Sequence, residues 1–75
     1  MQTLADLKIN NIGKVKSLLS KDHIRRRLGD IGLIKDTEVK CVLISPSNSI
    51  KAYLIRGSVF AIRKEDAKMI VIDSN

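Results

Sequence analysis

The pattern of apolar and polar residues is most regular in the second half of the chain, where two apolar runs flank Gly57 and Ser58. Glycine at the first position of a two-residue loop is typical of a type II′ turn, so this pattern predicts a β-hairpin. A two-residue loop also sets the register of the two strands. The predicted cross-strand pairs are Ile55 with Phe60, Tyr53 with Ile62, Leu54 with Ala61 and Arg56 with Val59.

Both faces of this predicted hairpin are largely apolar, because side chains along a strand alternate between the two faces of a sheet. We expect the first face to lie in the core; it consists of Tyr53, Ile55, Phe60 and Ile62. The second face, which we call the hairpin outer face, consists of Ala52, Leu54, Val59 and Ala61, bordered by Arg56 and Arg63. An apolar centre with an arginine rim is typical of a protein–protein interface. The alternative is that another segment, such as the helix predicted below, covers this face.

Apolar residues recur at helical spacing after residue 20 and predict a helix that runs through about Ile31. Ser20 or Asp22 is expected to cap its start, since either side chain accepts a hydrogen bond from an unpaired amide of the first turn. Ile24, Leu28 and Ile31 recur at the spacing of one helix face and predict a single apolar stripe.

Glycine residues mark the end of this helix. We expect Gly32 to adopt the left-handed conformation, so that Leu28 and Leu33 occupy the two positions that touch in a Schellman cap. Gly29 costs about 1 kcal/mol relative to alanine inside a helix. We therefore expect the helix to approach a neighbouring strand closely at Gly29.

The rest of the chain is divided by turn-forming residues into short segments. They are an opening turn at 3–7 with Leu4 and Leu7 directed into the core, a strand at 13–19 with Val15 inward, a strand at 37–44, a turn at 46–49, a tight connection at 64–67 and a strand at 69–72. Within 37–44, the alternation places Val39, Cys41 and Leu43 on one apolar face.

The predicted fold is mainly β, with about five strands and one helix of about three turns. Short strands and tight turns in so short a chain favour a small closed barrel, which removes exposed sheet edges. A split α+β sheet is the alternative. With 75 residues, the chain is expected to form one domain over residues 1–75, near the size at which a single core is only marginally sufficient.

The cysteine count and the lack of a signal or membrane segment predict a small cytoplasmic protein. Cys41 is the only cysteine, so an intramolecular disulfide is impossible and a reducing compartment is expected. The first residues lack the basic and apolar regions of a secretory signal, and no apolar run reaches membrane-spanning length.

The formal net charge of +6 allows either of two interpretations. It fits a nucleic-acid or anionic membrane surface, and it also fits the charge that small domains carry for solubility. Only residues 25–27 form a basic cluster, and successive helix residues diverge by about 100°, so these arginines do not share one patch. We favour the solubility interpretation.

Neither catalytic nor metal-binding chemistry is indicated. His23 is the only histidine, Cys41 is expected in the core, and no second ligand lies at metal-binding spacing. The four glycines are dispersed, so they form no phosphate-binding loop. We therefore expect no enzyme activity, no metal site and no cofactor.

Nucleic-acid binding is the main competing hypothesis for a small basic barrel. Barrels that bind single strands stack bases on exposed aromatic side chains in a basic groove. Tyr53 and Phe60 share the face that we assign to the core, which argues against such a platform.

Two segments resemble the signatures of the FeoA family. The first is Arg26-Arg27-Leu28-Gly29-Asp30-Ile31-Gly32-Leu33 followed by Thr37-Glu38-Val39, similar to a basic helix, a Gly-Leu stop and a strand that opens with Thr-x-Val. The second is Ala52-Tyr53-Leu54-Ile55-Arg56-Gly57 followed by Val59-Phe60-Ala61-Ile62-Arg63 and Asp66-Ala67. The resemblance covers nearly the whole chain in the same order.

Three turns depart from the usual residues of that family. The departures are Lys35-Asp36 in place of Pro-Gly, Asn48-Ser49-Ile50 in place of Gly-Asp-Pro, and Asn10-Asn11 in place of a common glycine. Asparagine and aspartate adopt backbone angles similar to those of glycine in turns, so we expect these departures to leave the fold unchanged.

The resemblance implies an SH3-like barrel without enzymatic activity that supports iron(II) uptake. Its implied partner is the membrane ferrous iron transporter FeoB, whose cytoplasmic portion includes a nucleotide-binding domain and would recruit the protein to the inner face of the membrane. The expected docking residues are Arg25, Arg26, Leu54, Arg56, Val59, Ala61 and Arg63. A regulatory domain of an iron-dependent repressor, nucleic-acid binding and self-association are the alternatives.

Overall fold

Five strands form one antiparallel sheet with the order β4-β3-β2-β1-β5 in the computed structural model, which describes residues 2–74. The elements in chain order are the 3₁₀ helix η1 (Leu4–Asp6), β1 (Ile12–Leu18), α1 (Asp22–Asp30), β2 (Glu38–Ile44), β3 (Ile50–Ile55), β4 (Ser58–Arg63), α2 (Lys64–Ala67) and β5 (Ile70–Ser74). The prediction of a mainly β fold with five strands is confirmed. The segment predicted as a tight connection at 64–67 is instead the short helix α2.

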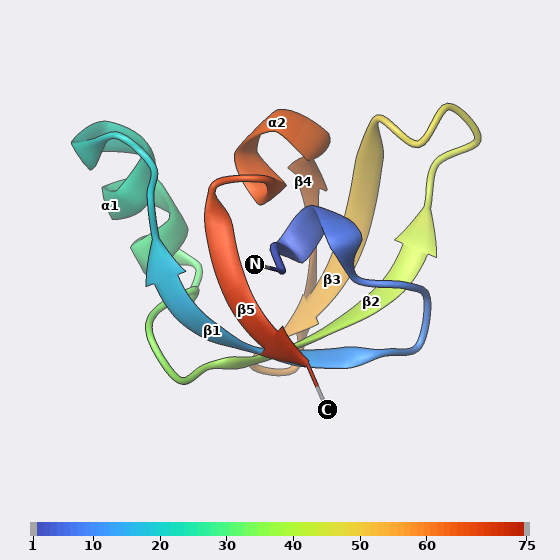
Figure 1. Ribbon diagram of the computed structural model, residues 1–75, viewed down its shortest axis with the longest axis horizontal. Coiled ribbons are helices and arrows are strands. Elements are labelled where there is room, and N and C mark those ends of the chain that lie inside the picture. Colours follow the sequence, from blue (N-terminus) through green and yellow to red (C-terminus); the bar gives the residue numbers. More distant parts are fainter. Residues whose placement is uncertain (1, 75) are drawn as a thin grey trace.

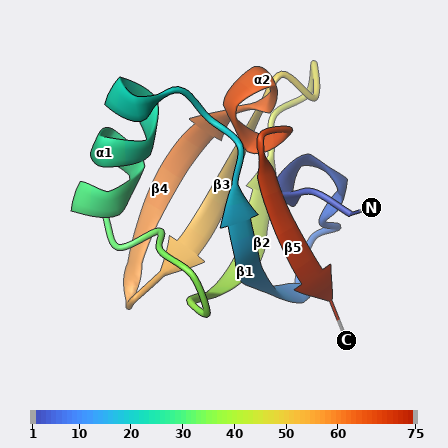
Figure 2. The ribbon, with the colours of Figure 1, turned by 60° about the vertical axis from the view of Figure 1, so that its left-hand side comes forward.

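The sheet curls around the core without closing (Figures 1 and 2). β4 and β5 lie at opposite ends of the strand order, and no ladder joins them within the described residues. The sheet is therefore not closed as expected, but the predicted small barrel-like fold is confirmed. Helix α2 and η1 occupy the mouth of the curled sheet between these two strands and take the place of further strand pairing (Figure 1).

The β3–β4 hairpin turns at Arg56 and Gly57, one residue earlier than predicted. Both residues have a positive φ, 50° and 83°, as the two central residues of a type I′ turn require. The predicted type II′ turn and register are wrong: the observed pairs include Ile55 with Ser58, Leu54 with Val59, Tyr53 with Phe60 and Ala52 with Ala61. Each partner shifts by two residues, so every side chain keeps its predicted face.

A β-bulge in β2 corrects the prediction for Leu43. The register runs from the pair Cys41–Tyr53 to the pair Leu43–Ala52, so one strand gains a residue between them. Val39 and Cys41 are fully buried as expected, whereas Leu43 is 63% exposed on the opposite face. The bulge changes the parity of the strand, which alternation alone does not reveal.

Helix α1 starts without the predicted side-chain cap. Lys21 is the N-cap residue and makes no side-chain capping bond. Ser20 is buried, and its Oγ has no hydrogen-bond partner among the described residues. The apolar stripe is confirmed, since Leu28 is buried and Ile24 and Ile31 pack partly buried against the core.

The helix ends in the predicted Schellman motif. Gly32 has a φ of 92°, and its N–H donates to the carbonyl oxygen of Gly29 at 3.0 Å. The N–H of Leu33 donates to the carbonyl oxygen of Leu28, also at 3.0 Å. The expectation for Gly29 is wrong, because a Cβ added there would meet no atom within 4 Å.

The three turns that depart from the family pattern all contain a residue in the left-handed region. These residues are Asn10, Asp36 and Asn48, with φ values of 68°, 71° and 59°. Asparagine and aspartate tolerate this region better than other residues with a side chain. The departures therefore retain the backbone geometry that glycine otherwise supplies.

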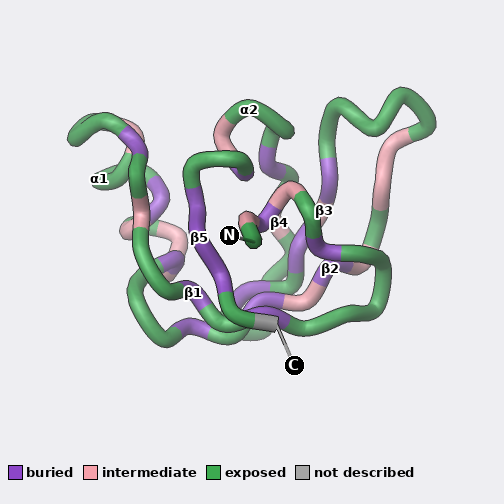
Figure 3. Tube along the Cα trace, in the orientation of Figure 1, coloured by how far each residue is buried: buried purple, intermediate pink, exposed green. Residues whose placement is uncertain are grey.

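The core lies inside the curl of the sheet (Figure 3). Its largest fully buried side chains are Leu4, Leu7, Val15, Leu33, Val39, Cys41, Tyr53, Ile55 and Ile70. Lys51 shares the inner face of β3 with Tyr53, and its ammonium donates to the carbonyl oxygens of Ala5 at 2.6 Å and Leu7 at 3.0 Å. These bonds fasten the N-terminal segment over the core.

Candidate interaction surfaces

No segment among residues 2–74 covers the centre of the hairpin outer face. Leu54 is 37% exposed, and its cross-strand partner Val59 is 60% exposed. Ala61 is also exposed, and Ala52 is half-buried. The alternative that helix α1 covers this face is wrong, because the apolar stripe of α1 packs toward the core.

Register across the sheet extends this apolar surface to two residues that the sequence analysis missed. Leu43 lies opposite Ala52. Ile12 lies opposite Lys40, which in turn lies opposite Leu54. Ile12 is 48% exposed, and a shallow hollow between it and Leu54 is lined by Glu38, Val39 and Lys40. The positions of Ile12 and Leu43 beside the outer face follow from the register of the sheet, and that of Leu43 depends on the bulge in β2.

The two rim arginines of the outer face differ in how they are held. Arg63 is exposed, and its guanidinium lies 4.0 Å from the carboxylate of Glu65. The stem of Arg56 lies against Gly32 at the end of α1, where an added Cβ would come within 2.6 Å of Arg56 Cδ. Arg56 also has the positive φ of the turn, so an arginine occupies a position that favours glycine or asparagine.

Arg25 and Arg26 are exposed on α1, on a different element from the hairpin outer face. Successive helix residues are rotated by about 100°, which places Arg26 roughly opposite the stripe that begins at Ile24. Arg27 lies three residues after Ile24, on the same side as the stripe. The helix arginine that comes near the hairpin is therefore Arg27, which belongs to the basic cluster at 25–27 but was not among the expected docking residues.

A groove of about 420 Å³ lies between α1, β4 and α2. Its lining consists of Arg27, Leu28, Ile31, Phe60, Ala61, Ile62, Arg63 and Asp66. The apolar side chains from α1 and β4 form its body, and two arginines and one aspartate supply its charge. We call this the β4 groove.

Burial changes the pKa of two side chains in the interior. Burial raises the pKa of the Cys41 thiol, whose Sγ is 3.9 Å from the carbonyl oxygen of Leu43. Burial also raises the pKa of Tyr53, which donates to the carbonyl oxygen of Leu4. Within residues 2–74, no three His, Cys, Asp or Glu side chains are grouped so that they could hold a metal ion. Among the same residues, none of the helices has the length and apolar character that crossing a membrane demands.

Comparisons with known proteins agree with this geometry. The FeoA domain model matches residues 2–74. No curated protein sequence matches the chain at a significant level. The chain is similar to the solved FeoA protein of Chlorobium tepidum, with 25% sequence identity and a TM-score of 0.92 over 97% of this chain and 70% of that one.

A second solved relative is FeoA of Stenotrophomonas maltophilia in complex with zinc. It shares 30% sequence identity, with a TM-score of 0.84 over 97% of this chain and 91% of that one. It is described as a prokaryotic SH3 domain protein and has been put forward as an activating factor of bacterial ferrous iron transport. The predicted SH3-like fold is confirmed by this likeness.

The fold also occurs in a larger regulatory protein. A manganese-dependent transcriptional repressor matches with a TM-score of 0.89 at 16% identity, over 99% of this chain and 41% of that one. At this identity the likeness concerns the fold alone.

Proposed function

We propose, from the premise that the chain belongs to the FeoA domain family, that it is an accessory protein of ferrous iron transport whose partner is the transporter FeoB. The family is associated with ferrous iron transport and is not a known enzyme family. The protein then acts as one domain at the cytoplasmic face of the membrane, by protein–protein contact rather than by chemistry of its own.

The observation that carries this proposal is the uncovered Leu54–Val59 pair at the centre of the hairpin outer face. Exposed apolar side chains that cluster on one face, with charged residues around them, are typical of interfaces. Ile12 and Leu43 enlarge the cluster, and Arg56 and Arg63 border it. The surface is assembled by sheet pairing and is therefore rigid before the partner binds.

The backbone conformation of Arg56 is a second reason to expect that this surface binds a partner. A residue with a side chain in the left-handed region costs about 1–2 kcal/mol relative to glycine there. An arginine at such a position is expected to have a role outside the turn, and the rim of a docking surface supplies one. We include Arg25 and Arg26 as secondary contacts on α1, separate from the hairpin outer face.

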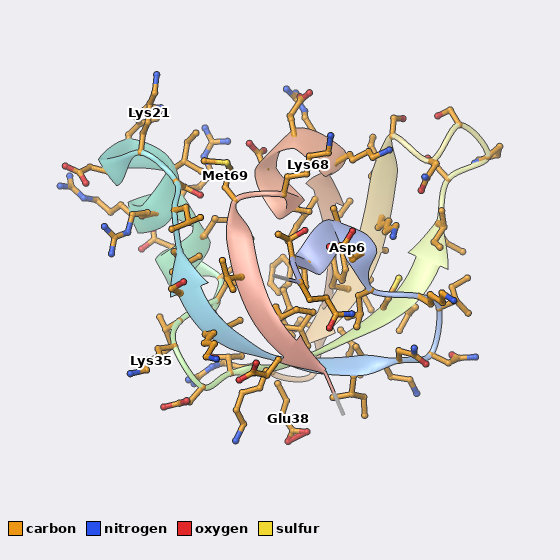
Figure 4. All side chains as sticks on the ribbon, in the orientation of Figure 1. Asp6, Lys21, Lys35, Glu38, Lys68 and Met69 are labelled. Atoms are coloured by element: carbon orange, nitrogen blue, oxygen red, sulfur yellow. The ribbon has the colours of Figure 1, made fainter. Side chains whose placement is uncertain are left out.

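Binding to the cytoplasmic domain of FeoB tests this proposal. Leu54→Glu and Ala61→Glu are expected to weaken binding at least tenfold, since each buries a charge in an apolar interface. Arg56→Asn retains a residue that tolerates positive φ and is expected to weaken binding while keeping the fold. Met69→Glu is the matched control, because Met69 is 41% exposed before β5 at the other end of the sheet (Figure 4).

The folded state of each variant is checked by its thermal unfolding. Unchanged FeoB binding in folded Leu54→Glu and Ala61→Glu variants would exclude the hairpin outer face as the docking site. A loss of binding in the Met69→Glu control would show that the effect is not confined to this face.

A regulatory domain of an iron-dependent repressor is the second candidate, and the fold that this chain shares with the manganese-dependent repressor is compatible with it. In that case the hairpin outer face is expected to contact the rest of such a chain instead of a transporter. Nucleic-acid binding has less support, because Tyr53 is fully buried and Phe60 is partly buried against the core. A gel-shift titration that shows no binding at physiological salt would exclude it.

A further inference from the structure

The two edge strands of the sheet, β5 and β4, differ in whether another backbone segment pairs with them. At the β5 end, the N-terminal segment pairs with the edge: Thr3 bridges Val71, and the N–H of Ile72 donates to the carbonyl oxygen of Gln2 at 2.9 Å. At the β4 end, no backbone segment pairs with the outer edge in the described part of the chain. An edge with unpaired N–H and C=O groups is a template for a further strand.

The hairpin register identifies the backbone groups at this open edge. In an antiparallel hairpin with a two-residue loop, the residues that flank the loop exchange hydrogen bonds, and so does every second pair after them. The flanking pair here is Ile55 and Ser58. The same phase continues past the strand, since the N–H of Lys64 donates to the carbonyl oxygen of Ser49 at 2.9 Å. Val59, Ala61 and Arg63 therefore direct their N–H and C=O groups away from β3.

The β4 groove lies beside this edge. Ala61 and Arg63 line it together with the inner side chains Phe60 and Ile62, and Leu28 of α1 belongs to the facing wall. A strand added along β4 would alternate its side chains between this apolar groove and the hairpin outer face. Alternate residues of such a strand are therefore expected to be apolar.

Charge selects among the strands that could bind. The groove contains two arginines, Arg27 and Arg63, and one aspartate, Asp66, in a chain with a net charge of +6. A second copy of β4 would bring another positively charged molecule, with its own arginines, against the same edge. An incoming segment is favoured instead if its side chains on the outer face, beside Arg63, are acidic.

We propose that the β4 groove binds an extended peptide segment of a partner, with alternating apolar and acidic residues, which adds a strand to the open edge of β4. This site uses the outward backbone groups of β4 and the β4 groove, whereas the proposed FeoB contact uses the side chains of the hairpin outer face, and it does not depend on FeoB as the partner. Backbone hydrogen bonds to β4 supply the register, and the apolar groove and the arginines supply the side-chain preference.

The probe is a short peptide of alternating valine and glutamate with blocked ends, titrated into the isotope-labelled protein and followed by NMR. We expect shifts at Val59, Ala61 and Arg63 and slower exchange of their amide protons. Ala61→Pro removes one outward N–H and leaves the ladder to β3 intact, as proline on an edge strand does. It is expected to weaken binding about tenfold.

Two modified peptides test the mechanism without changing the protein. N-methylation of every second peptide residue should abolish binding when these are the residues whose N–H groups face β4. N-methylation of the other residues should leave binding unchanged. A valine–lysine peptide should bind at least tenfold more weakly. Leu54→Gln should leave peptide binding unchanged, which separates this site from the proposed FeoB contact.

The proposal is overturned if both N-methylated phases bind equally, or if shifts appear at Leu54, Leu43 and Ile12 while the amide protons of Val59, Ala61 and Arg63 exchange as fast as before. Equal binding of the lysine peptide would overturn the acidic preference. Concentration-dependent dimerisation through β4 that the peptide does not compete with would assign the edge to a second copy of this chain.

Discussion

The hydroxyl group of Tyr53 donates a hydrogen bond of 3.0 Å to the backbone carbonyl oxygen of Leu4. Both residues are fully buried, and the bond joins the centre of β3 to the 3₁₀ helix η1. The carbonyl also accepts from the N–H of Leu7 at a longer distance of 3.2 Å. This polar contact therefore orients the N-terminal segment over the mouth of the sheet.

Tyr53→Phe is expected to lower the free energy of unfolding by about 1 kcal/mol. The substitution keeps the ring in the core and removes only the bond to Leu4, and a typical hydrogen bond contributes about 0.5–1.5 kcal/mol. Urea denaturation of the two proteins measures the difference. Equal stability would show that the Leu7 amide alone satisfies the Leu4 carbonyl.

Lys51→Met is expected to lower the free energy of unfolding by about 1–3 kcal/mol, because the carbonyl oxygens of Ala5 and Leu7 both lose their donor. The methionine keeps most of the apolar stem. Hydrogen exchange should show the largest loss of protection in η1. Lys68→Met is the control, since Lys68 is exposed after α2, and it should leave stability nearly unchanged (Figure 4).

The contacts of Lys51, a buried lysine on β3, could not be predicted from the sequence. The two faces of the hairpin could be predicted from alternation, and the register error of two residues did not alter them. Alternation also places Lys51 on the inner face with Tyr53. Its acceptors lie 44 and 46 residues away in sequence, however, and only the folded chain shows that they are close enough to bond.

Three further differences between the predicted and the observed structure also arise from contacts between segments that are distant in sequence. The turn type depends on the positive φ of Arg56, which no local preference of arginine predicts. The exposure of Leu43 depends on a bulge, and the β4 groove depends on where α1 lies relative to an edge strand. Each is set by contacts between distant segments, whereas the Schellman end at Gly32 is local and was predicted.

Acid is expected to weaken the start of the chain through Asp6. Its carboxylate accepts hydrogen bonds from the N–H of Thr3 at 2.9 Å and from the Thr3 hydroxyl at 3.2 Å. The backbone bond is the main reason that the pKa of Asp6 is lowered from its ordinary value of 3.8. The unfolded chain then binds the proton more readily, so stability falls as the pH drops below that value.

The measurement compares the melting temperatures of the wild type and Asp6→Ala at about pH 6 and about pH 2.5. The variant should be less stable than the wild type at the higher pH, and the difference should shrink at the lower pH. A constant difference between the two proteins would contradict the assignment of this acid sensitivity to Asp6.

Gly29→Ala is expected to raise the free energy of unfolding by about 0.5–1 kcal/mol. Glycine inside a helix costs about this much relative to alanine, partly through the flexibility of the unfolded chain. The added methyl group meets no atom within 4 Å. Urea denaturation provides the measurement, and a destabilised variant would contradict the open space around Gly29.

Gly32→Ala, three residues further along, is expected to have the opposite sign. The φ of 92° at Gly32 is unfavourable for alanine, and the new Cβ would come within 2.6 Å of Arg56 Cδ. We expect a loss of about 1–2 kcal/mol, which is the usual cost of the left-handed conformation. Combining Gly32→Ala with Arg56→Ala separates the two causes, because the shorter side chain relieves the contact and leaves the backbone cost. If the double variant recovers the full stability of Arg56→Ala, the contact with Arg56 is the only cause; if it recovers little, the left-handed backbone of the Schellman motif accounts for the requirement for glycine.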